Sequence, residues 1–375
     1  MMRITTNTTL YTYQKNLMKS SNQLYSAMNS VITGRNFDTY AADPAAATRA
    51  FQIHSSLNAT NTQASNNNAV LKKFSTAWDV ADDMIDKLVT DLAQAPALKG
   101  LSDTNLSTLN TQGDVIFSGA ESIIQSLNNT YNGSYIFAGA DTQNPPFAIE
   151  TEGDKHYVTY RGIRLGDPNS AYYEKEYLDE NGNTVPRDSS DPSKGNYTNQ
   201  EMLEKWDSEH LYVDIGIGFE LDRDDNVIPS TAFDSAISGA DFIGGAGLDE
   251  DGDPKNIVSI MLRLSEVFKG YDQENKTWSD AGDKEDAERL MGKLTKAQSA
   301  LSNQHVNLET KAEYLETNQS QLESSFDALN TELNSIERVD RVEAILTLSA
   351  AQTSYNAALQ VGANVIPQSL MDYLN

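Results

Sequence analysis

Residues 287–336 read AERLMGKLTKAQSALSNQHVNLETKAEYLETNQSQLESSFDALNTELNSI, and every seventh residue from the first is apolar. These positions are Ala287, Leu294, Leu301, Leu308, Leu315, Leu322, Leu329 and Ile336. A strict seven-residue apolar period is typical of an α-helix that packs one stripe against another helix in a left-handed coiled coil. A continuous helix over this stretch is about 75 Å long at 1.5 Å per residue. The stretch therefore predicts a long helix that needs a partner.

A second run with the same spacing lies near the amino end. It consists of Leu57, Ala64, Leu71, Trp78, Ile85 and Leu92, with Phe74, Ala81 and Leu88 at the intermediate positions of a 3-4 alternation. Because one run lies in each terminal third, they predict an antiparallel bundle closed by the two ends of the chain. The predicted bundle core is Leu57, Leu71, Trp78, Ile85, Leu92, Leu294, Leu301, Leu308, Leu315, Leu322 and Leu329.

Helix boundaries follow from local signals. Asp43 and Pro44 supply an N-cap oxygen and a residue preset for the first helical turn, so a helix should begin there and break near residues 96–100. Its early part is polar, with three asparagines at 66–68, and we expect partners to hold that part. A further helix is predicted over about 104–128.

The two ends of the chain carry thin apolar stripes that are too narrow to stabilise isolated helices. We expect residues 1–42 and 339–375 to be disordered in the free chain and to pair between copies, because ordering each residue costs about 1–2 kcal/mol. The predicted self-assembly core is Leu10, Leu17, Leu24, Val31, Ile345, Leu348, Tyr355, Leu359 and Ile366.

Between the helical regions the pattern changes to short alternating runs separated by turn residues. The pair Asn132-Gly133 predicts a turn before a strand. Further strands are predicted at 157–160, 212–217 and 219–221, turns at 181–182 and 224–226, an exposed loop at 188–199, a short helix at 257–267 and a loop at 270–283. The predicted fold is mainly α, with an outer β-rich domain (145–254) inserted into a helical shell (43–144 and 255–338).

Composition excludes several classes of function. The net charge of −26 argues against nucleic acid or an anionic membrane as the main partner, since both attract clustered Lys and Arg. The chain has no cysteine, so it has no disulfides or zinc-thiolate sites. The acidic run 249–253 has its glycine one place too early for a calcium loop and indicates a solvated turn. The first residues lack the pattern of a cleavable signal peptide, and no stretch is apolar for long enough to span a membrane.

Catalysis finds little support in the sequence. The four histidines, His54, His156, His210 and His305, are scattered along the chain. An acidic pair in the β-rich region could form a glycosidase site, but the sequence fixes no carboxylate separation. We therefore predict no catalytic, cofactor-binding or metal-binding residue and no cofactor.

Several separated segments resemble the flagellin superfamily and, within it, the bacterial hook-filament junction proteins, also called hook-associated protein 3. They are Gly34-Arg35-Asn36 followed by residues 43–47, the segment 132–139 with 144–147 after it, and the ending 369–374. Together the similar terminal regions cover somewhat over half of the chain. The central β-rich region has no pattern that matches the family.

The resemblance implies a structural protein that forms the junction between hook and filament, outside the cell on the flagellum, exported by the flagellar type III apparatus without a cleavable signal. Its implied partners are copies of itself in a helical tube, a neighbouring hook-associated protein, flagellin, and an export chaperone at the carboxyl-terminal segment. Flagellin itself is the nearest alternative, and a secreted enzyme or a tip protein of a type III secretion system are more distant ones.

Overall fold

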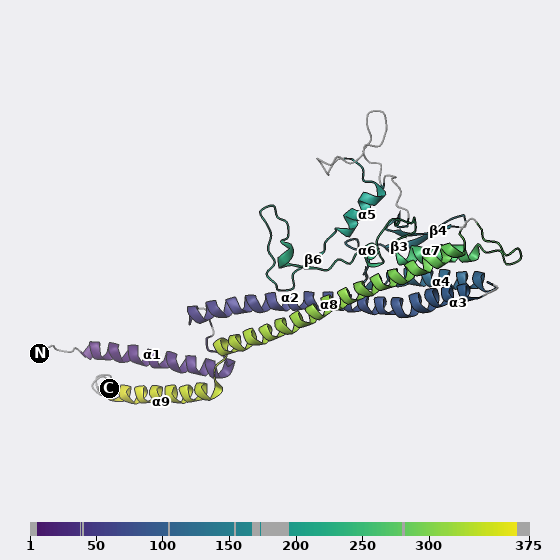
Figure 1. Ribbon diagram of the computed structural model, residues 1–375. Coiled ribbons are helices and arrows are strands. Elements are labelled where there is room, and N and C mark those ends of the chain that lie inside the picture. Colours follow the sequence, from purple (N-terminus) through teal and green to yellow (C-terminus); the bar gives the residue numbers. More distant parts are fainter. Residues whose placement is uncertain are drawn as a thin grey trace. The chain divides into compact units, whose positions relative to one another are not determined.

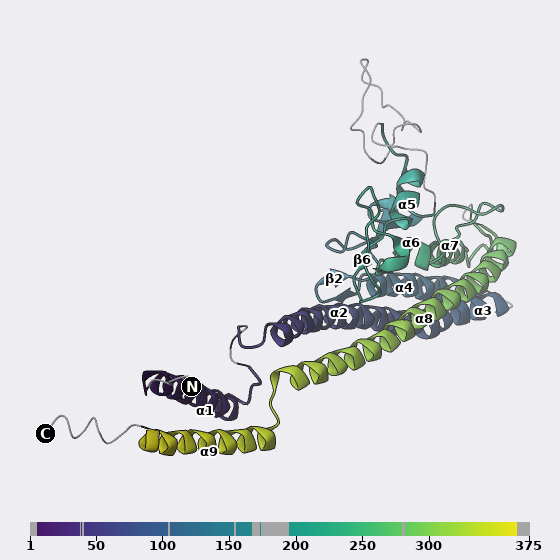
Figure 2. The same ribbon diagram turned by 90° about the vertical axis from the view of Figure 1, so that its left-hand side faces the viewer.

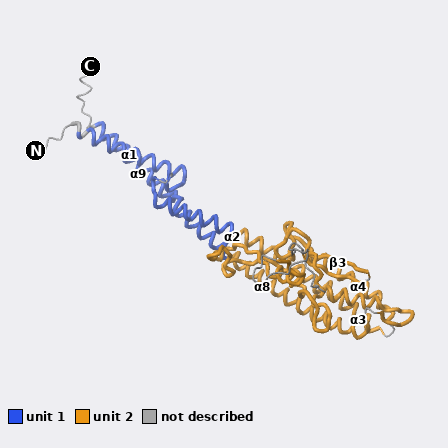
Figure 3. The backbone as a smooth tube through the Cα atoms, turned by 90° about the horizontal axis from the view of Figure 1, so that it is seen from above, with its two compact units in different colours: residues 1–62, 321–375 blue, residues 63–320 orange. Residues whose placement is uncertain are grey.

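A computed structural model describes residues 6–37, 39, 41–103, 106–153, 155–166, 173, 195–279 and 282–365. The chain divides into two compact units, one of residues 1–62 with 321–375 and the other of residues 63–320 (Figure 3). The long helices α2 (Pro44–Asp83) and α8 (Lys284–Glu337) contribute to both units. The order and disorder expected for residues 1–42 and 339–375 in the free chain stay predictions.

The amino-terminal end of α2 forms as its sequence predicts. The Asp43 side chain accepts a hydrogen bond from the backbone N–H of Ala46 at 3.0 Å, and Pro44 takes the first helical position. The helical stretch that was expected to break near residues 96–100 ends at Ser102, two residues beyond that range. A π-helix, η1 (Met84–Gln94), follows α2 directly, and α3 (Ala95–Ser102) continues from it through Pro96.

The core of the second unit runs along α8 (Figure 1). Leu294, Leu301, Leu308 and Leu315 are at most 5% exposed. On α2 the fully covered seam consists of Val70, Phe74, Ala77, Ala81 and Met84, whereas the predicted Leu71, Trp78, Ile85 and Leu92 are half-buried beside it. Two further helices, α4 (Leu109–Leu127) and α7 (Ile257–Lys269), pack on each other and complete this core.

The first unit has a smaller core of its own, formed where α2 begins and α8 ends. Leu57 and Leu322 are buried as predicted for the bundle, and Leu329 is half-buried. Ala50, Ile53, Leu57 and Leu333 form one cluster, with Phe37, Leu329 and Ile336 packed against it. Ion pairs between Arg49 and Glu332 and between His54 and Glu337 lie beside this cluster.

The β-strands are short and antiparallel. The turn at Asn132-Gly133 joins β1 (Thr130–Tyr131) to β2 (Ser134–Tyr135), and both turn residues have positive φ, as the sequence predicts. The main sheet contains β3 (Phe147–Glu152), β4 (Lys155–Tyr160) and β5 (Ile163–Arg164) in that order. The other elements of this region are α5 (Asn199–Asp207), β6 (Tyr212–Val213), η2 (Pro229–Thr231), β7 (Phe233–Asp234) and α6 (Gly239–Phe242).

Two strand predictions in this region are wrong. The strand expected over 212–217 has only two residues, and 219–221 forms only a single bridge between Leu221 and Val227. Gly216 and Gly218 adopt φ of 89° and 92°, which interrupts the extended backbone. The predicted turn at 181–182 and most of the loop at 188–199 lie outside the described residues. The fold class, mainly α with a small antiparallel β region, is confirmed.

The asparagines at 66–68, expected to be held by partners, are held within the chain. Asn67 is fully buried and donates to the carbonyl of Leu315 at 2.8 Å, while its own oxygen accepts from Asn318 at 2.9 Å. Asn318 also donates to the carbonyl of Ile215 at 2.8 Å, and Asn66 donates to that of Asp214 at 3.1 Å. This polar layer therefore joins α2 and α8 to the loop after β6.

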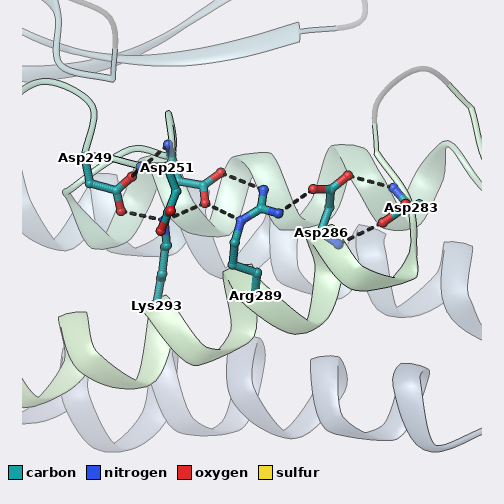
Figure 4. Close-up of polar contacts among 7 residues, drawn as sticks. Asp249, Asp251, Asp283, Asp286, Arg289 and Lys293 are labelled. Carbon is teal, nitrogen blue, oxygen red and sulfur yellow. Dashed lines mark hydrogen bonds and ion pairs between the residues drawn. The ribbon is translucent and has the colours of Figure 1, made fainter.

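The acidic run at 249–253, expected to be a solvated turn, is docked on α8 (Figure 4). Lys293 lies 2.6, 2.9 and 2.7 Å from carboxylate oxygens of Asp249, Asp251 and Asp253, and Arg289 pairs with Asp253 at 2.8 Å. The Asp253 side chain is only 6% exposed. Burial alone would raise its pKa, but the hydrogen bonds from Arg289 and Lys293 outweigh burial and hold the pKa below its usual range. The hydrogen bond from Lys293 likewise lowers the pKa of Asp249.

The core of the second unit predicts a large effect for Leu315→Ala. Leu315 is 0% exposed, so truncation should lower the free energy of unfolding by about 2–5 kcal/mol in urea denaturation. Val306→Ala on the same helix is the matched control, since Val306 is 54% exposed and its truncation should cost less than about 0.5 kcal/mol. Equal effects of the two substitutions would contradict this description of the seam.

The docked acidic loop predicts a pH-dependent effect for Lys293→Met. Because the folded chain lowers the pKa of Asp249 and Asp253, their pairing stabilises the chain above the ordinary carboxyl pKa of about 4 and is lost as the pH falls below it. The variant should therefore lose most stability at pH 7 and progressively less below pH 4, measured by urea unfolding across that range. The exposed Lys296→Met is the control, and a stability loss that stays constant with pH would refute the prediction.

Candidate self-assembly surface

Two helices in the first unit, α1 (Thr6–Thr33) and α9 (Arg341–Val365), lie side by side and antiparallel (Figures 1 and 2). Their paired ends are joined by a short clasp. Gly34, at φ 68°, ends α1, and its carbonyl accepts from the N–H of Val339 at 3.1 Å. Asn36 donates through its side chain to the carbonyls of Ile336 and Arg338. The clasp fixes where α1 and α9 begin to pack.

The fully buried positions in the seam between α1 and α9 carry small residues. Among their described side chains, the only apolar ones that are fully covered are Ala27 and Ala344. Gly362 packs directly against the ring of Tyr13, where a Cβ would have no room. The buried hydroxyl of Ser20 finds no hydrogen-bond partner among the described residues, which carries an energetic penalty. The pairing therefore buries little apolar surface.

The predicted self-assembly residues divide between this seam and the exposed surface. Leu10, Leu17, Leu24, Val31, Leu348 and Tyr355 are half-buried in or beside the seam. Ile345 and Leu359 are 57% and 43% exposed, and Ile366 lies outside the described residues. The structure thus brings the two terminal segments together within one chain and leaves part of the predicted set uncovered.

A second apolar stripe on α1 was missed by the sequence analysis. Tyr11, Met18, Tyr25 and Ile32 recur every seven residues, one position after Leu10, Leu17, Leu24 and Val31, and are 60–71% exposed. The same seven-residue spacing could have revealed this stripe. On α9, Val342, Leu346 and Val361 are also more than half exposed. Exposed apolar surface on this scale is typical of an interaction site.

An open groove of about 850 Å³ lies where α1, α9 and the clasp meet. Small and polar side chains from both helices line it, among them Ser26, Ser30, Thr347 and Ala351. Well-packed helix pairs leave few voids larger than a water molecule. The groove therefore indicates that α1 and α9 do not fill the space between them.

The histidines do not form a catalytic group. His54 pairs with Glu337, His156 contacts the Phe117 ring, and His305 stacks on Trp78, so each has its own structural neighbour. His210 binds Asp234 at 2.7 Å, and Asp234 also accepts from the backbone N–H groups of Leu211 and Ala236.

An acidic recess of about 180 Å³ in the second unit is the most enzyme-like feature. It contains Asp207, Asp234 and Asp241. Burial raises the pKa of Asp207, and the hydrogen bond from Ser238 partly offsets that effect. Because Asp207 is engaged by Ser238 and Asp234 by His210, both carboxylates serve local structure. Among the described residues, no cluster of three or more His, Asp or Glu is arranged to hold a metal ion.

The described helices also include none that combines the length and apolar character needed to cross a lipid bilayer. Helices α1 and α9 carry repeated exposed apolar side chains that alternate with polar residues. The exposed apolar stripes of this helix pair are thus the strongest candidate for a functional surface.

Comparison with known proteins shows which family and which solved structures the chain is similar to. Residues 4–142 match the family described as the bacterial flagellin N-terminal helical region. The fold is similar to a protein of Vibrio parahaemolyticus described as a flagellar hook-associated protein, with 11% identity and a TM-score of 0.50, covering 79% of this chain and 100% of that one. No curated protein sequence matches the chain.

Two further solved structures that are similar to this chain are also flagellar proteins by name. Bacillus cereus FlgL shares 14% identity and a TM-score of 0.43, covering 76% of this chain and 99% of that one. Flagellar hook-associated protein-3 from Legionella pneumophila also shares 14% identity and a TM-score of 0.43, covering 76% of this chain and 98% of that one.

The family match covers α1, α2, η1, α3, α4 and the hairpin of β1 and β2, which include several of the segments that carry the resemblance in the sequence. That resemblance is confirmed. Residues 4–142 therefore match the bacterial flagellin N-terminal helical region, and the fold is similar to that of a solved flagellar hook-associated protein.

Proposed function

We propose that this chain is a structural component of the bacterial flagellum that forms the junction between hook and filament, through helical self-assembly of α1 and α9. The observation that carries the proposal is the contrast within this helix pair. The fully buried positions of its inner seam are alanine, serine and glycine, and the leucines there are only half-buried, whereas its outer faces carry large apolar side chains such as Tyr11, Ile32 and Ile345. The role is structural rather than catalytic, and its location is the flagellum outside the cell.

The balance between apolar burial and the entropic cost of ordering favours a pathway in which α1 and α9 complete their folding on assembly. Covering one large apolar side chain contributes about 1.5–3 kcal/mol, while ordering each residue costs about 1–2 kcal/mol. Since the α1–α9 seam covers few large side chains completely, apolar burial within the pair offsets only a small part of the entropic cost of ordering the two helices. Neighbouring copies that cover the stripe Tyr11, Met18, Tyr25 and Ile32 supply the missing stabilisation.

Identical subunits that use two different faces extend into a helical tube instead of closing as a dimer. The α1 stripe and the exposed side of α9 provide two such faces. The proposed partners are therefore further copies of this chain, with a neighbouring hook-associated protein at one end of the layer and flagellin at the other. An export chaperone that binds the carboxyl-terminal segment would keep its apolar side chains covered before assembly.

Flagellin is the second candidate function, and the family match over residues 4–142 supports it specifically. Both proteins would use the same terminal helices. They differ in copy number, because a junction protein forms a thin layer whereas flagellin forms the whole filament. Counting subunits per flagellum by quantitative mass spectrometry separates the two.

The assembly surface is tested by the double substitution Ile345→Ser and Leu359→Ser. Both side chains are exposed in the free chain, so its melting temperature should stay within about 2 °C of the parent, whereas incorporation onto isolated hooks should fall at least tenfold. Val306→Ser, at a similarly exposed apolar position on α8, is the matched control and should assemble normally. Normal incorporation of the double variant would refute a role for this surface.

The junction role is tested in cells of the source bacterium that lack this chain. Electron microscopy should show hooks without filaments, and flagellin should appear in the culture medium. Re-expression of the chain should restore filaments, whereas re-expression of the Ile345→Ser, Leu359→Ser variant should not. Normal filaments in the deletion strain would exclude the junction role, and hooks that lack filaments but release no flagellin would favour the chain being flagellin.

A further inference from the structure

Helix α1 contains no acidic residue, although the whole chain has a net charge of −26. Its only charged residues are Lys15 and Lys19, which lie one helical turn apart and are both exposed. Neither ammonium group has an ion-pair partner among the residues that the structure describes. The outer face of α1 therefore holds two positive charges that its own surroundings do not neutralise.

The two lysines lie beside the exposed apolar stripe of α1. Tyr11, Lys15, Met18 and Asn22 follow one another at spacings of four, three and four residues, so their side chains share one face of the helix. Tyr11 and Met18 are each 69% exposed. An open recess of about 590 Å³ lies on this face and is lined in part by Lys15, Met18, Lys19 and Asn22. The face thus offers apolar contacts and positive charge together.

The carboxyl end of α9 lies beside the start of this face. Gly362 packs against the Tyr13 ring, and α9 ends three residues later at Val365. The next residues in the sequence are Ile366 and Pro367, and a proline disfavours helical backbone at the residue before it. The chain that follows α9 therefore starts beside the first turns of α1, and its sequence opposes a straight continuation of the helix.

Residues 366–375 lie outside the described residues, but their sequence, IPQSLMDYLN, is complementary to this face. The apolar residues are Ile366, Leu370, Met371, Tyr373 and Leu374. The only charged residue among the ten is Asp372. Ten residues span up to about 33 Å when extended, whereas Tyr13 and Asn22 are only about 14 Å apart along the axis of α1. The segment is therefore long enough to turn back and reach the recess.

We propose that residues 366–375, the tail, fold back onto the outer face of α1 in the free chain and cover Tyr11 and Met18. Apolar side chains of the tail pack on these two residues, and Asp372 lies beside the lysine pair. Exposed ion pairs contribute little stability, and the tail offers few apolar groups, so its docking is weak enough to be reversed by a competing partner.

The docked tail restrains contact between free copies. It reaches the first half of the apolar stripe and leaves Tyr25 and Ile32 exposed for the first contact with another copy. A neighbouring copy that packs on the rest of the stripe then displaces the tail. This displacement rests on the proposed function, whereas the docking of the tail is a property of the isolated chain.

The absence of native cysteine allows the docked tail to be detected by a distance measurement. Spin labels are attached to the full chain at Asn22→Cys, an exposed position on α1, and at Asn375→Cys, and pulsed electron paramagnetic resonance is recorded in dilute solution. A docked tail should give a distance below about 20 Å, whereas a tail that continues away from α9 places the labels more than about 30 Å apart. A one-to-one mixture of singly labelled chains should show no short distance, and a short distance there would overturn docking within one chain.

Charge variants test whether the lysine pair holds the tail. Asp372→Lys should lower the ratio of short to long distances about threefold, the effect of losing one exposed ion pair. Glu309→Lys makes the same change of charge at an exposed position on α8 and should leave the distances unchanged. Combining Asp372→Lys with Lys15→Glu and Lys19→Glu should restore the short distance. A single long distance in the parent, or an equal loss in Glu309→Lys, would overturn the proposal.

Assembly kinetics test whether the docked tail restrains contact between copies. The released tail of Asp372→Lys should shorten the lag before incorporation onto isolated hooks about threefold, in proportion to the loss of the docked population. An unchanged lag beside a released tail would overturn the restraining role. Failure of the parent to assemble would instead refute the proposed function, and the distance measurement in dilute solution would still decide whether the tail docks.

Discussion

Burial of the α8 leucines is the interaction on which the rest of the second unit depends. Leu294, Leu301, Leu308 and Leu315 are almost completely covered, and α2 meets them with a seam that includes Phe74 and Met84. Neither helix has a stripe wide enough to be stable alone, so each provides the apolar cover that the other requires. Helices α4 and α7 extend this core, and the sheet of β3, β4 and β5 packs on its outer side through α4 and α7. The short strands are stable because the helices supply their hydrophobic support.

The same seven-residue period has a different structural role in each of the two units. In the second unit the repeated positions carry large residues that are buried within the chain. In the first unit only small residues of the α1–α9 seam are fully buried, its leucines are half-buried, and a neighbouring stripe of large residues on α1 is exposed. Small inner residues limit the stability of the pair, whereas the outer stripe provides surface for another molecule. This division is the physical basis of the proposed self-assembly.

The sequence predicts the elements of this fold well where local signals, such as a helix cap or a turn, determine the structure without opposing tertiary contacts. The N-cap at Asp43, the hairpin turn at Asn132-Gly133 and the leucine period of α8 are all found as expected. Prediction from the sequence fails where contacts between distant residues determine the local structure. The heptad of Ile85 and Leu92 predicts an α-helix, but residues 84–94 form a π-helix in which the Thr90 hydroxyl donates to the carbonyl of Ile85 and accepts from Gln298 on α8. The acidic loop reads as solvated because Lys293, its partner, lies some forty residues further along the chain.

The buried Asn67 has a consequence for how the long helices find each other. A repeat of nearly identical leucine layers offers several alignments that differ by whole heptads and bury similar apolar area. Only the alignment seen here sets Asn67 beside the carbonyl of Leu315 and the amide of Asn318. A slip of seven residues would remove the hydrogen bond that Asn318 donates to Asn67, and an unpaired buried amide costs about 1–3 kcal/mol. This asparagine layer therefore specifies one alignment of an otherwise repetitive helix pair, and so determines where the outer region attaches along the pair.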